Sequence, residues 1–267
     1  MKKIFTLTFL LLVTPVLLHA QTGVKKRRPL PFEYGRVLIS TPNLSPDLPD
    51  VQFDHWLHRA KYTCRLCHVD IGFAMKRNAT GIKAEDNIKG YYCGTCHNGK
   101  MPHGDRAIFK ACEKTYTEVE LGSRCRRCHS VGEKVRAEYD FASFTGTFPR
   151  ERFGNGIDWE KTEEAGLVKL VDFIEGISFK RRQIEVPKDF ELSTKVESMP
   201  EILFSHKKHS KWSGCEGCHP EIFAGVKKGN TKYSMTEIFE GRYCGQCHTT
   251  VAFPTTDCQR CHSKPVR

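Results

Sequence analysis

A single short pattern, C-x-x-C-H, occurs six times in this chain of 267 residues and takes up twelve of its thirteen cysteines. Each copy places two thiols and one imidazole within five consecutive residues, and chance placement would produce well under one copy. The six copies are Cys64, Cys67 and His68; Cys93, Cys96 and His97; Cys125, Cys128 and His129; Cys215, Cys218 and His219; Cys244, Cys247 and His248; and Cys258, Cys261 and His262. Whatever the chain folds around must therefore engage two sulfurs and one nitrogen at six places.

This spacing is typical of a covalent attachment site for c-type haem, in which both thiols add to vinyl groups and the histidine becomes an iron ligand. Zinc sites also use C-x-x-C pairs, but they do not need a histidine after every second cysteine. Disulfides leave the histidines unexplained, and an odd number of cysteines cannot all pair within one chain. The sequence therefore predicts six covalently bound haem c groups.

The N-terminus predicts export. Residues 1–20 begin with Lys2 and Lys3, continue with an apolar run and end in a small residue, as a secretory signal peptide does. An uncleaved anchor is the alternative, but the run falls short of the ~20 apolar residues that a span needs and contains Pro15. We expect a periplasmic protein without stable membrane insertion after cleavage; outer-membrane association or an extracellular location stays open.

Spare histidines matter because haem iron has two axial positions. Five histidines remain once His19 and the six motif histidines are set aside. Four of them form two H-x-x-H pairs at the same distance before the first and the fourth motif, namely His55 with His58 and His206 with His209. We interpret these four as iron ligands, and His103 is the fifth spare histidine.

The chain contains an internal duplication. Phe53, His55, His58 and the first C-x-x-C-H motif recur 151 positions later, and this offset holds through the second motif of each copy. The first copy is longer after that, because 28 positions separate His97 from Cys125 whereas 10 separate His248 from Cys258. We predict one module at 51–130 and another at 201–267, joined by a linker at 131–200.

Each half resembles the triheme c7-type cytochrome domain, a relative of the cytochrome c3 family. The resemblance is carried by the F-x-H-x-x-H lead, the three C-x-x-C-H sites and the G-x-Y-C-G-x-C-H segment, over about residues 51–130 and 201–262. It implies which histidines face each other across an iron. The implied pairs are His55 with His68, His58 with His97, His206 with His219, and His209 with His248.

The sequence leaves the second axial ligand of the third haem in each module open. The resemblance implies a histidine or methionine before the second motif, where the second half has Met235 and the first half has Ala84. Met235 is therefore a candidate ligand, with simple packing as the alternative. For the first half the candidates are His103, which we favour, Met75 and Met101. A methionine ligand would raise the reduction potential of its haem relative to two histidines.

Little regular structure is expected, because six porphyrins would supply much of the apolar core. We predict a mostly irregular fold with small α-helices and no large sheet. Residues 21–50 read as an irregular N-terminal segment, and residues 159–177 favour a short helix. Cys112 lies outside any haem motif and is interpreted as a buried or idle thiol, or one that pairs between chains.

The charge fits this interpretation. Loss of Lys2 and Lys3 with a signal peptide lowers the formal net charge from +11 by two, to +9. Haem propionates would shift the sum to about +3 in the oxidised and about −3 in the reduced protein. Much of the basicity can therefore balance propionates, which disfavours a nucleic-acid partner and leaves room for an acidic redox partner.

We therefore expect an electron carrier of anaerobic respiration and not an enzyme. Its partners would be redox proteins, namely inner-membrane dehydrogenases, terminal reductases or outer-membrane conduits. The alternative is a multihaem reductase, of nitrite or metal, with one open iron position. All six motifs end in histidine, and none has the lysine-ended form of multihaem nitrite reductases.

Overall fold

The computed structural model describes residues 28–40, 48–115, 117–130, 134–194, 196, 198–225 and 227–264. The chain divides into two units, Met1–Leu30 and Pro31–Arg267, and every named element lies in the second. The signal peptide predicted for residues 1–20 lies outside the described residues. In the part of the chain that is described, no helix combines the length and the apolar character needed to cross a bilayer.

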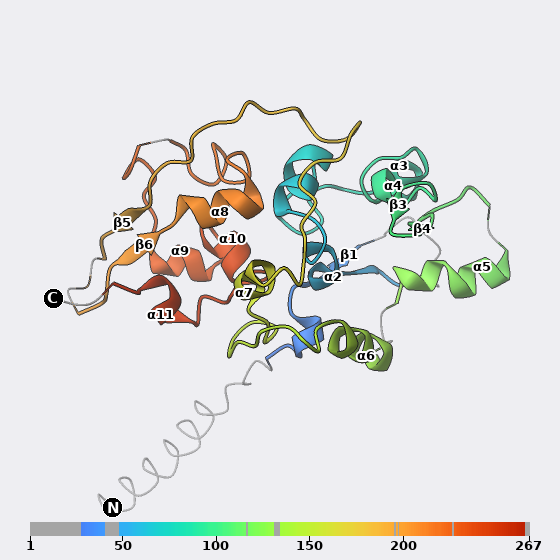
Figure 1. The fold of residues 1–267 in the computed structure, drawn as a ribbon. Coiled ribbons are helices and arrows are strands. Elements are labelled where there is room, and N and C mark those ends of the chain that lie inside the picture. The colour runs from blue at the N-terminus through green and yellow to red at the C-terminus, as the bar shows by residue number, and fades with distance from the viewer. Residues whose placement is uncertain are drawn as a thin grey trace, which may run out of the picture. The chain divides into compact units, whose positions relative to one another are not determined.

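Regular elements are short throughout, so the predicted fold class is confirmed (Figure 1). The tight turns are the 3-10 helices η1 (Pro31–Glu33) and η3 (Cys125–Arg127) and the π-helical η2 (Leu66–Ile71). The strands are β1 (Arg36–Ile39), β2 (Val51–Asp54), β3 (Pro102–His103), β4 (Arg106–Ala107), β5 (Phe190–Leu192) and β6 (Ile202–Phe204). The α-helices are α2 (His55–Arg59), α3 (Ala84–Ile88), α4 (Cys93–Cys96), α5 (Glu118–Ser123), α6 (Lys134–Phe144), α7 (Trp159–Glu164), α8 (His206–Ser213), α9 (Met235–Phe239), α10 (Gly245–His248) and α11 (Cys258–Cys261).

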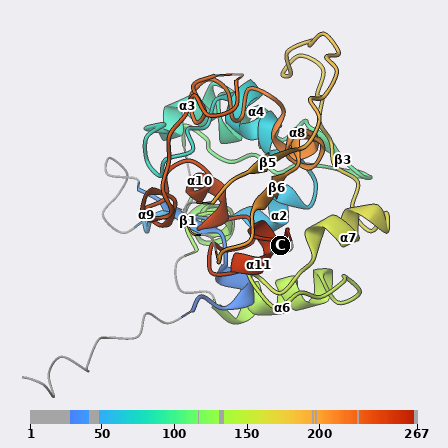
Figure 2. The same cartoon turned by 90° about the vertical axis from the view of Figure 1, so that its left-hand side faces the viewer.

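Each copy of the duplication begins with a two-stranded antiparallel sheet that leads into the H-x-x-H helix. β1 pairs with β2 so that Val37 faces Phe53, and β5 pairs with β6 so that Phe190 faces Phe204. Figure 2 shows β5 and β6 side by side above α11. The expectation of an irregular segment at 21–50 is therefore wrong for β1, because a strand of four residues gains its stability from a distant partner that local sequence does not reveal.

The second half of each copy is built alike. α3 and α9 each have five residues, and the third residue of each is a carboxylate that accepts from the backbone N–H three residues earlier: Asp86 from Lys83 at 3.0 Å, and Glu237 from Ser234 at 2.9 Å. This contact satisfies a backbone donor just before the first turn of the helix, and at Ser234 the capping is reciprocal, because its hydroxyl accepts from the backbone N–H of Glu237. It sets where the helix before the second motif starts in each module.

A glycine after the first cysteine of the second motif allows α4 to approach α3 and α10 to approach α9. A Cβ at Gly94 would lie 1.9 Å from the carbonyl oxygen of Asn87, and one at Gly245 would lie 1.9 Å from that of Ile238. No side chain fits at such a distance. The second glycine of the shared G-x-Y-C-G-x-C-H segment, Gly94 or Gly245, is therefore required for the two helices to pack.

The segment between the modules contributes much of the protein's own core. Phe141, Phe148, Ile157, Trp159 and Val168 are half of the ten buried apolar residues among those described. Trp56 of α2 packs edge-on against Phe141 of α6, with ring centroids 5.2 Å apart. α7 agrees with the helix predicted within 159–177: Asp158 accepts from the backbone N–H of Lys161 at 3.1 Å, and the helix ends before Gly166, whose φ is +70°.

Candidate haem-binding site

The C-x-x-C-H motifs are single turns of helix, which brings the first cysteine and the histidine onto one side. In five motifs the histidine backbone N–H donates to the carbonyl oxygen of the first cysteine, four residues back. These bonds are His97 to Cys93 (2.8 Å), His129 to Cys125 (2.8 Å), His219 to Cys215 (3.0 Å), His248 to Cys244 (3.0 Å) and His262 to Cys258 (2.8 Å). The remaining motif, at Cys64–His68, runs into η2.

All thirteen cysteines are free thiols, so none is used in a disulfide. Burial raises the pKa of Cys67, Cys93 and Cys247 to about 12, which keeps these thiols protonated at neutral pH. Several of these thiols are electrostatic neighbours: Cys96 raises the pKa of Cys67, and Cys64 and Cys218 raise that of Cys247. This is the state from which thioether bonds to vinyl groups would form.

Backbone carbonyls orient the imidazoles. Nδ1 of each of five motif histidines lies within hydrogen-bonding distance of a carbonyl oxygen. These contacts are His68 to Phe73 (2.8 Å), His129 to Pro49 (2.6 Å), His219 to Phe223 (2.8 Å), His248 to Phe253 (3.1 Å) and His262 to Pro200 (2.7 Å). A protonated Nδ1 leaves the lone pair on Nε2, the arrangement that metal-ligating histidines use.

The H-x-x-H histidines follow the same rule. Nδ1 of His55 lies 2.5 Å from the carbonyl oxygen of Gly35, that of His206 lies 3.4 Å from that of Lys188, and that of His209 lies 2.8 Å from that of Ser205. The strands β1 and β5 thus begin just after the carbonyls that orient the first histidine of each pair. These short strands are part of the ligand support.

His58 and His97 differ in this respect. The carbonyls of Asp54 and Phe109 are close to their Nδ1 atoms, but neither meets hydrogen-bonding geometry, so both nitrogens are buried without a partner among the described residues. Burial lowers the pKa of His58 to about 4, as it does for His55 and His248. These imidazoles are neutral at physiological pH and able to bind a metal.

Two of the implied histidine pairs have the separation that one iron requires. The ring centroids of His58 and His97 are 6.2 Å apart, and those of His209 and His248 are 6.1 Å apart. A metal-bound imidazole nitrogen lies about 2 Å from the metal and about 1.1 Å from its own ring centroid, so two ligands on opposite sides would be about 6.2 Å apart.

Phenylalanine rings flank both pairs in the same way. Phe53 lies against His58 and Phe204 against His209, each with centroids 4.4 Å apart. Phe109 lies 4.5 Å from His97, and Phe253 lies 4.3 Å from His248. The phenylalanine that opens each F-x-H-x-x-H lead therefore packs on the second histidine and restricts its ring.

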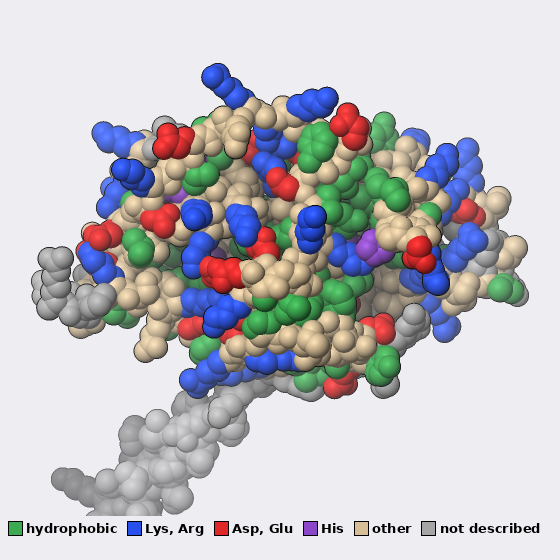
Figure 3. Space-filling model, in the orientation of Figure 1, with side chains coloured by type: hydrophobic (Ala, Val, Ile, Leu, Met, Phe, Trp, Pro, Cys, Tyr) green, Lys and Arg blue, Asp and Glu red, His purple; other side chains and the backbone are tan. Residues whose placement is uncertain are grey.

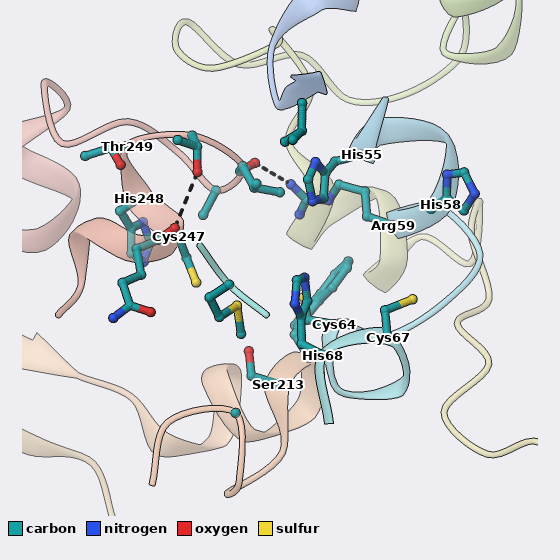
Figure 4. A pocket seen from close by; sticks show the side chains of 18 of the residues that line it. His55, His58, Arg59, Cys64, Cys67, His68, Ser213, Cys247, His248 and Thr249 are labelled. Atoms are coloured by element: carbon teal, nitrogen blue, oxygen red, sulfur yellow. Dashed lines mark hydrogen bonds between the residues drawn. The ribbon is translucent and has the colours of Figure 1, made fainter. Parts of the chain in front are cut away.

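His55 and His68 project into one hollow from α2 and from the first motif (Figure 4). Protonated His68 would lower the pKa of His55, which places the two rings within electrostatic range of each other. His206 is half-buried at the start of α8, and His219 is the last residue of the fourth motif.

 A continuous cavity of about 2730 Å³ is lined by residues of both modules, including ten of the twelve motif cysteines; Cys125 and Cys215 are not among its lining residues. An ordinary small-ligand pocket has roughly 300–1,000 Å³, so this cavity has room for several large groups. The free thiols, the oriented imidazoles and the cavity together fit covalently bound haem.

The candidates for the third haem of each module lie in different surroundings. Met235 is the first residue of α9, is 42% exposed and lines the cavity. His103 lies in β3, where its Nε2 is 3.0 Å from Nζ of Lys61. Lys61 in turn lowers the pKa of His58 and His97, so His103 lies on the side of that pair. Met75 lines the cavity as well.

Cys112 lies close to the second and third motifs. Its sulfur is 4.0 Å from Nδ2 of Asn87, and as a neighbouring thiol it raises the pKa of Cys93 and Cys128. Burial raises the pKa of Cys112 itself. Cys112 is therefore a half-buried thiol, and its role as an idle side chain or as one that pairs between chains stays a prediction.

Arg59, the last residue of α2, was not singled out by the sequence. Its guanidinium lies over the rings of Trp159 and Trp212, with 4.7 and 5.1 Å from Cζ to the centroids, and Nη1 donates to the carbonyl oxygen of Val251 at 3.0 Å. These partners come from the linker and from the second module. An arginine after H-x-x-H carries no recognisable motif, so only the folded chain reveals this contact.

These features define a multihaem c-type cytochrome. The chain belongs to the family described as cytochrome c7 and related cytochrome c, whose model matches residues 51–130 and 202–263, more than half of the sequence. The two matched regions coincide with the two copies of the duplication. No curated protein matches the sequence significantly.

Solved structures with detectable similarity come from one multihaem protein. The C-terminal hexahaem fragment of GSU1996 is 23% identical, with 89% of this chain and 99% of the fragment covered and a TM-score of 0.26. The dodecahaem cytochrome c GSU1996 is also 23% identical, with 85% of this chain and 73% of that chain covered and a TM-score of 0.26. Scores this low carry no argument about how the elements are arranged.

Proposed function

We propose that the protein is a periplasmic hexahaem cytochrome that carries electrons between respiratory redox proteins. The observation that carries the proposal is the spacing of the His58–His97 and His209–His248 pairs, 6.2 and 6.1 Å between ring centroids. Iron closed on both sides by imidazole exchanges electrons without binding a substrate. When bound, haem c supplies a one-electron Fe(III)/Fe(II) couple, and the chain holds and spaces the groups.

The ligand assignment extends this proposal to all six motifs. Each motif provides two thioether sulfurs and one axial histidine, for six haems in total. The second axial ligands proposed are His55, His58, His206 and His209, with His103 and Met235 as candidates for the third haem of each module. The contact of His103 with Lys61 makes its assignment the weaker of these two.

The intact mature protein tests the proposal directly. Its mass is expected to exceed that of the polypeptide by six haems, and EPR of the oxidised protein is expected to show low-spin ferric iron at the bis-histidine sites. A mass equal to that of the bare polypeptide would refute covalent haem, and predominantly high-spin iron would refute axial closure by the histidines.

The proposed partners are redox proteins on either side of the periplasm: inner-membrane dehydrogenases, and terminal reductases or outer-membrane conduits. Figure 3 shows Lys and Arg side chains spread over the visible face among Asp and Glu, and not gathered into one stripe. A dispersed distribution of this kind supports the balancing of propionates more than a nucleic-acid surface. On α8 the exposed Lys207 beside His206 offers a contact for an acidic partner, whereas Lys208 and Lys211 pair with Glu160 and Glu163 of α7 at 2.5 and 2.9 Å.

A second candidate function is reduction of a small substrate at one open iron. The observation that favours it is Ala84, which starts α3 where Met235 starts α9 and cannot bind metal. Carbon monoxide added to the reduced protein separates the two functions. Binding at one haem would favour the reductase, and a spectrum unchanged by carbon monoxide would favour the carrier.

A further inference from the structure

Arg59 is half-buried at the edge of the cavity and carries a positive charge without a carboxylate partner. Among the described residues no Asp or Glu lies within ion-pair distance of its guanidinium, whose contacts are two tryptophan rings and one backbone carbonyl. Burial lowers the pKa of Arg59, but an arginine starts so far above neutrality that it stays charged. The two ring faces offset part of the desolvation cost without cancelling the charge.

Such a charge is costly to bury unless something nearby benefits from it. The titratable groups that face Arg59 are the thiols of Cys64 and Cys247, the imidazoles of His55 and His248, which belong to the same two haem sites, and the phenol of Tyr34. Tyr34 donates to the carbonyl oxygen of Ala252 at 2.5 Å, and burial raises its pKa to about 12, so it stays neutral. The remaining neighbours are therefore attachment points of two haems.

These two attachment points belong to different modules. Cys64 opens the first motif, and Cys247 closes the fifth; Figure 4 shows both around the hollow that Arg59 borders. The modules are in close contact here, since a Cβ at Gly214 would lie 2.4 Å from Cδ of Arg65. The thiol of Cys64 is also an electrostatic neighbour of Cys218 and Cys247.

We propose that Arg59 raises the reduction potentials of the haems attached at Cys64–Cys67 and Cys244–Cys247, which makes this junction the crossing point for electrons between the modules. The inference rests on the proposed function. One electron passes from a ferrous iron, which is oxidised, to a ferric iron, which is reduced; no bond or proton is exchanged. A fixed buried cation favours the form with the extra electron at either haem.

The test is a redox titration of the holoprotein with optical and EPR detection. Arg59→Met removes the charge and keeps an apolar stem, and replacing a buried charge by an apolar residue is often tolerated. At an effective dielectric constant of about 20, a unit charge on the order of 10 Å from a redox centre changes its reduced-to-oxidised ratio roughly tenfold at fixed potential, and this sets the scale of the expected change. That corresponds to about 59 mV for one electron. Two of the six haems are expected to shift to lower potential.

Two further variants separate charge from packing. Arg59→Lys keeps the charge, so the reduction potentials of the two haems are expected to stay close to those of the wild type. An equal shift of these potentials in Arg59→Lys and in Arg59→Met would overturn the proposal. Arg242→Met is the matched control, because Arg242 lies two residues before Cys244 but is exposed and paired with Glu240 at 2.8 Å. It is expected to leave all six potentials unchanged.

The remaining outcomes are also decisive. Arg59→Gln replaces Arg59→Met if that variant loads haem poorly; if neither variant loads six haems, the role of Arg59 is structural and the proposal is wrong. Unchanged reduction potentials in a variant with six low-spin haems would contradict the role proposed for Arg59 and leave the proposed function standing. A wild-type protein without haem would instead contradict the proposed function.

Discussion

Met235 and Ala84 occupy the same position, at the start of α9 and of α3, in otherwise similar modules. If Met235 binds the iron of the third haem in its module, Met235→Leu is expected to lower that haem's reduction potential or to leave it open to carbon monoxide, because a thioether ligand favours ferrous iron. The measurement is a redox titration with and without carbon monoxide. Met199→Leu is the control, since Met199 is similarly exposed at 40%; if both variants behave as wild type, Met235 packs without binding iron.

At the residue scale the sequence predicted what depends on local spacing. The motif cysteines and histidines, and the duplicated Phe53 and Phe204 leads, are recognisable because their chemistry requires neighbours within a few residues. Arg59 could not be found in this way, because its partners Trp159 and Trp212 lie 100 and more positions away. The preference for His103 had the same weakness, since its neighbour Lys61 is brought to it only by folding.

At the element scale, the approach of α10 to α9 sets the position of the second motif. Gly245→Ala would place a Cβ 1.9 Å from the carbonyl oxygen of Ile238, so the two helices must separate. We expect a loss of roughly 1–3 kcal/mol in unfolding free energy, visible as a lower thermal midpoint of the holoprotein. Gly122→Ala in α5 is the control, because nothing lies within 4 Å of its added Cβ. A thermal midpoint no lower for Gly245→Ala than for Gly122→Ala would contradict the packing role.

Element boundaries were predicted less well than motifs. β1 and β5 are strands of four and three residues, which is too short for a clear alternation of apolar and polar residues. Their pairing partners lie further along the chain. α6 was not predicted within the linker, although it supplies the buried Phe141. Both omissions have one physical cause: short elements are stabilised by packing against distant residues and not by intrinsic propensity.

At the scale of the whole molecule, the linker holds the two modules together through ion pairs. Arg181 pairs with Asp70, two residues after the first motif, and its Nε donates to Glu216, inside the fourth motif, at 2.6 Å. The carboxylate of Asp70 is fully buried, and its Oδ2 has no hydrogen-bond partner among the described residues. Asp70 and Glu216 raise the pKa of Arg181, which shows that the charged pair is favoured. The linker thus joins the first and the fourth haem sites, and does not merely connect the modules in sequence.

Arg181→Gln is therefore expected to destabilise the protein, because it leaves the buried Asp70 carboxylate without a counter-charge. Breaking a buried pair costs about 3–5 kcal/mol, and we expect the lower end because the Arg181 side chain is 20% exposed. Lys180→Gln is the neighbouring control: Lys180 and Glu175 are 82% and 79% exposed and 3.9 Å apart, so this pair contributes about 0–1 kcal/mol. Thermal unfolding of both holoproteins, followed by loss of the low-spin spectrum, measures the difference. Equal midpoints would show that the Arg181 contacts do not hold the modules together, and an Arg181→Gln variant that unfolds in two steps would show that each module is stable without its partner.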